Sequence, residues 1–207
     1  MNEKYPAASV TFTWKRAAHV YAVNGAEVIY RGDTGPYLPV IGDLNMPPDS
    51  GKYFYEIRTN CFTCKVGVCA VDTFPEDVEL QSVELGGPPT VSGRNSTQPN
   101  LHHCLLFNCQ SSMVELNGSE VKSLWKLFVP TSGARFGFLV DTNEGIVKLY
   151  VNDVYGGIIA DPTTGLKGVT LCPCIALVEV ALNNAIVEGG RLGAFVSPPR
   201  KLDEFNI

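Results

Sequence analysis

The residues best suited to chemistry are the seven cysteines and three histidines of this 207-residue chain. Cys61 and Cys64 form a CxxC pair, which can supply two of the four ligands of a zinc site. The other cysteines and histidines repeat neither the CxxC nor an HxxxH spacing. On a strand, Cys61 and Cys64 would also face opposite sides. We therefore expect no bound metal and seven free thiols scattered over core and loops.

The run His102-His103-Cys104 offers either a metal cluster or a Cys–His nucleophile pair. Adjacent side chains on a strand point apart, so these three cannot converge on one ion. A thiol hydrolase also needs a third group that orients the base. No local cysteine-protease signature surrounds any of the seven cysteines. The sequence thus predicts a non-enzymatic protein, and a thiol-dependent enzyme is the alternative that stays open.

Cofactor motifs are missing from the sequence. No GxxxxGK[ST] phosphate loop occurs, and the glycines of the second half occupy expected strand and turn positions. The spacing of Asp141, Glu144, Asp153 and Asp161 matches no EF-hand loop. We assign these acids to turns and expect no cofactor.

The composition indicates one compact globular domain with an acidic surface. Hydrophobic residues make up 45% and charged residues 18%, and the net charge is -5. No basic run exceeds two residues, which argues against nucleic-acid binding through phosphate neutralisation. No apolar stretch approaches the roughly 18 residues that span a membrane, and the N-terminus lacks the apolar segment of a signal peptide. We expect a cytoplasmic or nuclear protein with free thiols.

The elements that must position these residues are β-strands. Residues 134–141 and 146–151 alternate apolar and polar side chains with a period of two, which is typical of strands. Between them, residues 141–145 end in glycine and predict a hairpin loop. In this register Leu149 lies in the core and Lys148 faces solvent.

Further alternating or apolar runs predict about a dozen strands, and no run of ten residues keeps a helical period. The expected strand regions are 10–15, the hairpin 20–30, 52–58, 65–71, 102–109, 113–116 and 169–180, the last broken by Pro173. Residues 123–129 fit a strand or a helical turn equally well. Four prolines and three glycines exclude a central strand from the loop 31–50. Residues 74–100 form a second long irregular segment.

Three segments in order resemble the SPRY (B30.2) family. They are the Gly-aromatic run 51–57, the hairpin region 134–159 with its LYVN strand, and the run 171–177 with its proline. The resemblance spans roughly residues 9 to 182. It implies an all-β fold, a bent antiparallel β-sandwich of the concanavalin-like or SPRY jelly-roll kind with long loops. We expect this domain at residues 9–198, with tails at 1–8 and 199–207.

The resemblance also implies a partner site where three segments meet at one end of the sandwich. They are the loop 31–50, the loop that follows residue 71, and the turn at 178–180. The implied contacts are Arg31, Tyr37, Leu38, Asp72, Phe74, Val178 and Glu179. Glu179 would suit a ligand that carries Lys or Arg. The alternative for Tyr37 and Leu38 is that they cover the core beneath their loop.

A rigid β scaffold with long loops and no catalytic constellation favours recognition. SPRY domains are protein-interaction modules, so the resemblance implies a peptide or protein partner and a role as an adaptor in a ubiquitin-ligase or signalling assembly. The chain shows no RING, B-box, coiled-coil or SOCS-box pattern, so we expect a stand-alone domain or a fragment, and a monomer. The rival function is a lectin-like carbohydrate binder, which would need an exposed tryptophan. Trp14 and Trp125 both lie in apolar surroundings.

Overall fold

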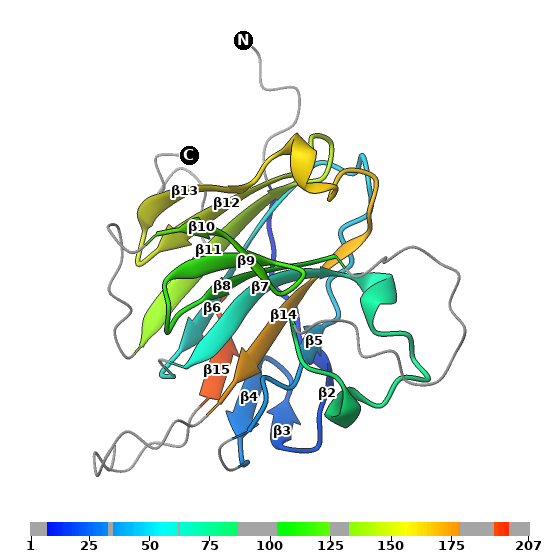
Figure 1. Cartoon of the computed structure of the whole chain (residues 1–207), viewed down its shortest axis with the longest axis vertical. Helices are drawn as coiled ribbons and strands as arrows, with labels where there is room; N and C mark the ends of the chain where they lie inside the picture. Colours follow the sequence, from blue (N-terminus) through cyan, green and yellow to red (C-terminus); the bar gives the residue numbers. More distant parts are fainter. Residues whose placement is uncertain are drawn as a thin grey trace.

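The computed structural model of the chain describes residues 8–32, 35–61, 63–86, 103–124, 133–178 and 193–198. Two β-sheets face each other as a sandwich (Figure 1). Within the described ranges there are fifteen strands and three short 3-10 turns, and no α-helix. None of the described helical turns is long or apolar enough to cross a membrane. The expected all-β, bent antiparallel sandwich is confirmed.

Sheet A has eight strands, and β6 lies near its centre. Seven strands form a continuous path with antiparallel neighbours, and β1 (Ala8–Ser9) joins β6 in parallel. The path runs β13 (Val154–Ala160), β12 (Ile146–Val151), β11 (Ala134–Asp141), β6 (Lys52–Thr59), β15 (Gly193–Val196), β4 (Glu27–Tyr30) and β3 (Tyr21–Asn24).

Sheet B has seven strands, all paired antiparallel. Its order is β10 (Ser119–Ser123), β9 (Met113–Leu116), β8 (Cys104–Asn108), β7 (Cys64–Ala70), β14 (Leu171–Leu177), β5 (Val40–Gly42) and β2 (Trp14–Ala17). The 3-10 turns are η1 (Val71–Thr73), η2 (Leu80–Ser82) and η3 (Pro162–Thr164).

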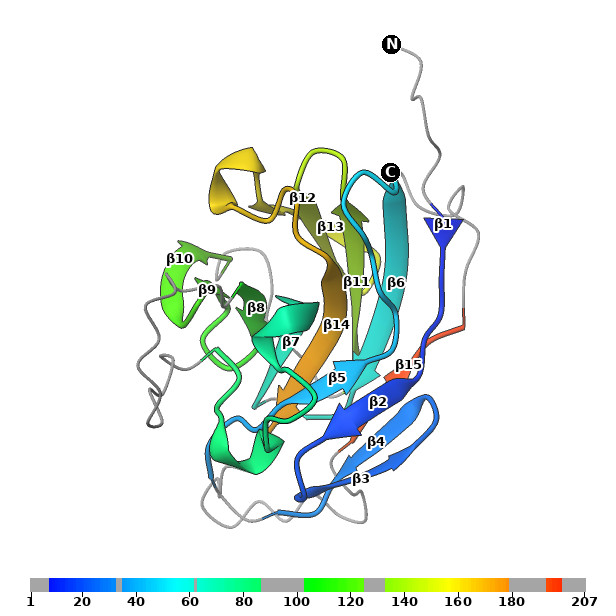
Figure 2. The same ribbon diagram turned by 90° about the vertical axis from the view of Figure 1, so that its right-hand side faces the viewer.

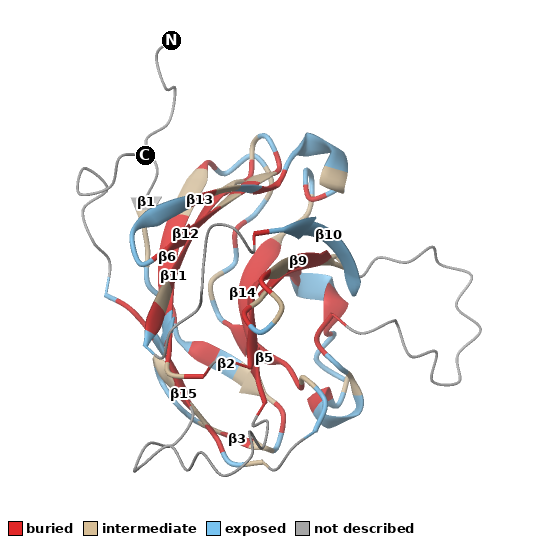
Figure 3. Cartoon of the chain, turned by 60° about the vertical axis from the view of Figure 1, so that its left-hand side comes forward, coloured by how far each residue is buried: buried red, intermediate tan, exposed pale blue. Residues whose placement is uncertain are grey.

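The core lies between the two sheets, where aromatic rings from both layers meet. The rings of Phe107 in sheet B and Phe136 in sheet A have centroids 5.9 Å apart. Tyr55 stacks on Phe138, and its hydroxyl donates to the Gly67 carbonyl across the layer at 3.0 Å. Buried residues line the strands of both sheets, whereas β10 and part of β13 are exposed (Figure 3).

The predicted central hairpin is confirmed. Strands β11 and β12 pair Val140 with Val147, and the Asp141 carboxylate accepts hydrogen bonds from two backbone amides of the loop. Gly145 closes the loop with a φ of +69°, which a residue with a side chain rarely adopts. Leu149 is fully buried and Lys148 is half-buried, so the register is as expected.

The loop 31–50 contains a strand that the sequence excluded. Strand β5 lies between β14 and β2, one place from the edge of sheet B. The prediction was wrong because it counted prolines over the whole loop. Val40, Ile41 and Gly42 fall between the prolines, so each of the three has its backbone N–H.

Strand β14 runs through Pro173 without a break, which corrects a second expectation. On the β5 side, Leu171 exchanges two backbone hydrogen bonds with Met46. Alternate residues of a strand direct their backbone groups to the same side, so the Pro173 nitrogen also faces this side. Pairing with β5 begins only at Cys174, and the missing N–H therefore costs no ladder bond.

The first predicted strand is in fact a crossing between the sheets. Phe12 and Trp14 are buried and Thr11 and Thr13 are exposed, as the alternation predicts. Strand geometry begins only at Trp14, however, and residues 10–13 connect β1 in sheet A with β2 in sheet B. Strand β10 was not foreseen, because all five of its residues are exposed and lack an apolar face.

Candidate functional site

Tyr37 lies at the end of the sandwich where β7 begins and β14 ends. The hydroxyl of Tyr21 links the loop of Tyr37 to the end of β14. It lies 2.8 Å from the Leu38 carbonyl and accepts a hydrogen bond from the Leu177 amide at 2.9 Å. Pro36 precedes Tyr37, and its carbonyl accepts from the Leu38 amide at 2.9 Å. The backbone on both sides of Tyr37 is therefore fixed.

The Tyr37 side chain is half-buried, and polar groups surround it. Its hydroxyl donates to Gln110 Oε1 at 3.3 Å, and Lys65 Nζ lies 4.6 Å from the ring centroid. Burial raises the pKa of Tyr37 to about 12, and the neighbouring Cys64 thiol acts in the same direction. At neutral pH the phenol is thus protonated, as its hydrogen bond to Gln110 requires.

A buried ion pair holds Lys65 beneath the Tyr37 ring. Lys65 Nζ lies 2.9 Å from Glu115 Oε2, and the two side chains are only 10% and 7% exposed. Asn108 donates to the other carboxylate oxygen of Glu115 at 2.8 Å. A buried pair with further hydrogen bonds has few alternative arrangements, so it fixes the position of the cation under the ring.

Three other implied contacts, Arg31, Leu38 and Val178, lie at the same end. Arg31 is exposed, and its backbone amide donates to the Val20 carbonyl at 2.7 Å. Leu38 is 7% exposed and packs in the core, which matches the alternative given for it. Val178 is also buried, and its amide donates to the Thr63 carbonyl at 2.9 Å.

Of the implied contacts described at this end, Tyr37 and Arg31 present the accessible side chains. Glu179 lies outside the described residues. Its assignment as a contact therefore stays a prediction.

Asp72 lies at the opposite end of sheet B. It belongs to η1, directly after β7, whereas Tyr37 lies beside the start of that strand. The seven residues of β7 separate the two ends by roughly 20 Å. Since β7 and β14 are antiparallel neighbours, the loops that follow them must lie at opposite ends. The predicted contact Asp72 therefore does not meet Tyr37 and Val178 at one place.

Residues 71–86 return across the outer face of sheet B, and we name them the cover (Figure 2). Arg16 holds the cover in place, because its guanidinium donates to the carbonyls of Phe74 and Val78. At the far end of the cover, the Leu85 amide donates to the Tyr37 carbonyl at 2.6 Å. Phe74 belongs to this segment, and its side chain packs in the core rather than being presented for contact.

The cover buries a group of thiols on the outer face of sheet B, made of Cys69, Cys104, Cys172 and Cys174. The Sγ atoms of Cys69 and Cys172 lie 3.6 Å apart. Burial raises the pKa of Cys174 to about 11. These thiols are packing groups, and a nucleophile would need an accessible thiolate.

The remaining three cysteines are buried as well. Cys64 and Cys109 have Sγ atoms 3.2 Å apart beside Cys61. All seven cysteines are free in the structure, as the sequence predicts. No group of three His, Cys, Asp or Glu side chains among the described residues could hold a metal ion.

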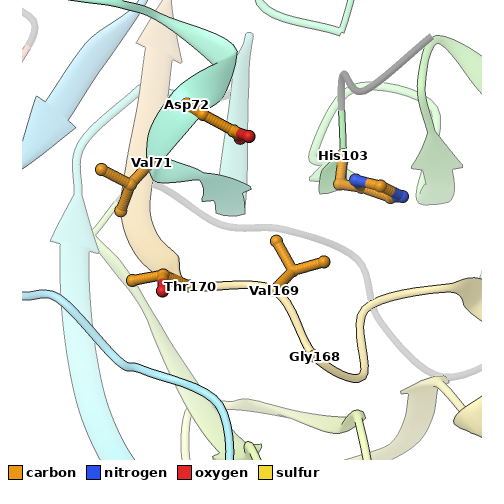
Figure 4. Close-up of a pocket in the computed structure, with 6 residues that line it drawn as sticks. All are labelled: Val71, Asp72, His103, Gly168, Val169 and Thr170. Atoms are coloured by element: carbon orange, nitrogen blue, oxygen red, sulfur yellow. The ribbon is translucent and has the colours of Figure 1, made fainter. Parts of the chain in front are cut away.

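A pocket of about 490 Å³ opens at the Asp72 end (Figure 4). Val71, Asp72, His103, Gly168, Val169 and Thr170 line it. The sequence singled out His103 only as a metal or nucleophile candidate, and it gave no signal for Gly168, Val169 or Thr170. Such a signal is absent because the three lining segments become neighbours only through the pairing of β7 with β8 and β14.

Trp14 does not support a sugar site. Trp14 is buried, and its indole N–H donates to the Ala26 carbonyl at 3.1 Å. Trp125 lies outside the described residues. A stacking platform for a sugar ring is therefore not formed by Trp14.

These features define a two-sheet β-sandwich whose loops, rather than its strands, supply the accessible sites. The TRIM65 PSpry domain is similar to this chain with a TM-score of 0.59, at 15% identity over 92% of this chain and 93% of that one. The SPRY domain of human HERC1 gives a TM-score of 0.55 at 12% identity, over 89% of this chain and 96% of that domain.

A stonustoxin structure gives a TM-score of 0.56 at 14% identity, and the match covers 91% of this chain and 29% of that one. No family model and no curated protein sequence matches this chain. The chain has a SPRY-like fold, and the resemblance seen in three short sequence segments is confirmed at that level.

Proposed function

We propose that this chain is a non-enzymatic protein-interaction module that recognises a short peptide or protein surface at the Tyr37 end of the sandwich. The SPRY-like fold supports an interaction module. The half-buried Tyr37 is the reason for placing the site at this end. Its backbone is fixed between Pro36 and Pro39, while part of its ring and its hydroxyl can contact a ligand.

A preorganised tyrosine is well suited to anchor a partner. Little side-chain or loop entropy is lost on binding when the flanking backbone is already ordered. Tyrosine is among the residues that most often dominate the binding energy of an interface. Arg31, exposed in the same loop, adds a charge at the rim, and Glu179 is the proposed acidic contact for a Lys or Arg of the partner.

The wider role rests on the SPRY likeness alone. We assign the chain to an adaptor or substrate-recognition function in a ubiquitin-ligase or signalling assembly, in the cytoplasm or nucleus. The proposed domain covers residues 9–198 and acts as a monomer.

The test starts with a partner captured from extract of the source cells and identified by mass spectrometry. Its affinity is then measured for the wild type, Tyr37→Ala and Tyr155→Ala. Tyr155 is the matched control, because it is a tyrosine 49% exposed on β13 of the other sheet. We expect Tyr37→Ala to cost more than about 1–2 kcal/mol of binding free energy, and Tyr155→Ala to cost little.

The melting temperature of each variant is measured in parallel, so that unfolding is not mistaken for lost binding. Glu179→Lys should weaken capture of a basic partner in a salt-dependent manner. Wild-type affinity in folded Tyr37→Ala would refute the site. Preferential binding to a glycan array over a peptide array would refute the function in favour of the lectin-like alternative.

A further inference from the structure

The pocket at the Asp72 end is built from three chain segments that the sheet holds in register. Val71 and Asp72 follow β7, His103 precedes β8, and residues 168–170 precede β14. Two backbone hydrogen bonds join the segments, from the Ala70 amide to the His103 carbonyl at 2.7 Å and from the Val71 amide to the Thr170 carbonyl at 2.9 Å. The three segments that line the pocket are therefore held together by backbone hydrogen bonds at the end of sheet B.

Three polar side chains of this pocket have no partner within the described part of the chain. The Asp72 carboxylate, the His103 imidazole and the Thr170 hydroxyl make no hydrogen bond or ion pair there. Elsewhere on the surface, Asp43 accepts hydrogen bonds from Thr13, and Asp161 accepts one from Thr163 of its own loop. The pocket groups are free to bond to a ligand instead.

The remaining walls of the pocket are apolar. Val71 is 40% exposed and Val169 is half-buried, and both line the pocket. Among the described lining residues there is no lysine or arginine. The ammonium of nearby Lys167 lies 3.8 Å from the carboxylate of Glu144. An anionic ligand would thus meet the Asp72 charge with no compensating cation in the lining.

We propose that this pocket binds the side chain of a lysine or arginine presented by a protein partner. The aliphatic stem packs against Val71 and Val169, and the cationic head pairs with the Asp72 carboxylate. An alkyl chain that ends in a cation is the side-chain type that suits both an apolar wall and a charged rim. Asp72 and Gly168 are exposed, so a polypeptide can pass across the mouth.

This site is separate from the Tyr37 end, from which β7 separates it by roughly 20 Å. The inference does not depend on the proposed function of Tyr37. A protein partner long enough to reach both ends would gain affinity from two weak contacts on one domain.

The experiment is an NMR titration of ¹⁵N-labelled full chain with the capped tripeptide acetyl-Ala-Lys-Ala-amide. The matched probe is acetyl-Ala-norleucine-Ala-amide, which keeps the alkyl stem and lacks the charge. We expect the lysine peptide to shift the amides of Val71, Asp72, His103, Gly168 and Thr170, and the norleucine peptide to bind about fivefold more weakly. Fivefold is the upper end for an exposed ion pair.

Asp72→Asn should lower the affinity for the lysine peptide by the same factor and leave the norleucine affinity unchanged. Asp77→Asn is the control variant, because Asp77 is an exposed acid of the cover outside the pocket lining. It removes the same net charge and should leave both affinities unchanged. The ¹⁵N spectrum of each variant reports whether it is folded.

Equal binding of the two peptides, shifts that map elsewhere, or an equal loss in Asp72→Asn and Asp77→Asn would overturn the proposal. n-Butylammonium carries the same stem and cation as the lysine side chain and should shift the same amides, so its failure to do so would also overturn the proposal. Tyr37→Ala is expected to bind the lysine peptide as the wild type does. Failure at this pocket therefore leaves the Tyr37 proposal standing, and the reverse also holds.

Discussion

The outer faces of the two sheets differ although both belong to one sandwich. On sheet A, the outer face carries a small cluster of Phe54, Leu139 and Tyr150, separate from the main core. Beside it, Arg135 pairs with Glu56 at 3.2 Å. On sheet B, the cover lies over the outer face, and strands β7 and β14 are buried at every residue.

The difference shows how a β-sandwich acquires sites. A face without a cover offers strand side chains in a regular array. The cover of sheet B instead creates two margins, with Tyr37 beside Leu85 at one and the pocket beside Asp72 at the other. Accessible concave features thus arise where an irregular segment enters and leaves a sheet face.

The largest expected effect tests the core that both faces share. Leu149→Ala removes a fully buried side chain of sheet A and should lower the free energy of unfolding by about 2–5 kcal/mol. Lys148→Ala, on the outer face of the same strand, should change it by less than about 1 kcal/mol. Urea denaturation measures both. Equal losses would show that the outer face of sheet A is packed as deeply as the core.

The next effect tests whether the cover excludes water. Glu115→Gln leaves the Lys65 ammonium buried without its counter-charge and should cost about 3 kcal/mol of stability. Glu76→Gln is the control, because the Lys15–Glu76 pair is 59% and 90% exposed and should contribute less than about 1 kcal/mol. Similar costs for the two variants would mean that the Lys65–Glu115 pair is solvated.

Alkaline pH should act on the thiols of the covered face. Burial raises the pKa of Cys174 to about 11 from an ordinary value of 9.0. Its contribution to stability is complete below pH 9 and is lost as the pH rises to 11, because the unfolded state releases its proton first. The loss should be on the order of 2 kcal/mol. In Cys174→Ala, chemical denaturation at pH 8 and pH 11 should show a correspondingly smaller difference.

The smallest effect concerns the attachment of the cover. Arg16→Ala removes two hydrogen bonds to the cover carbonyls and should cost about 1–2 kcal/mol. Native-state labelling of Cys104 by a thiol reagent should become faster, because this thiol lies under the cover. Arg58→Ala, at an exposed position of sheet A, should leave the labelling rate unchanged. An unchanged rate in Arg16→Ala would show that other contacts hold the cover.

The strands were predictable where alternation and turn chemistry agreed. The β11–β12 hairpin combines period-two burial with an Asp-to-Gly loop, and both signals are local. Strand β5 was not predicted, because its three residues are too few to show a strand alternation within a loop that contains four prolines. The predicted break at Pro173 was wrong, because a proline in a strand loses a hydrogen bond only if its nitrogen faces a paired neighbour. Which side of the strand is paired depends on the tertiary structure.

For the candidate site, the sequence resemblance predicted Tyr37 as a contact but gave no indication of the geometry around it. Flanking prolines are visible in the chain, whereas the Lys65–Glu115 pair beneath the ring depends on the pairing of β7 with β8 and of β8 with β9. The separation of Asp72 from Tyr37 follows from strand direction. It becomes derivable once β7 and β14 are known to be antiparallel neighbours.

Arg16 binds the cover through main-chain carbonyl oxygens rather than through side chains. Every residue type supplies a backbone carbonyl, so the anchor tolerates substitution at the positions that it holds. Only Thr73, Phe74, Leu80, Leu85 and Gly86 are buried within the cover. The exposed positions between them can drift in sequence without loosening the segment. Descendants of this chain can therefore change what they present at both margins while they inherit the same scaffold.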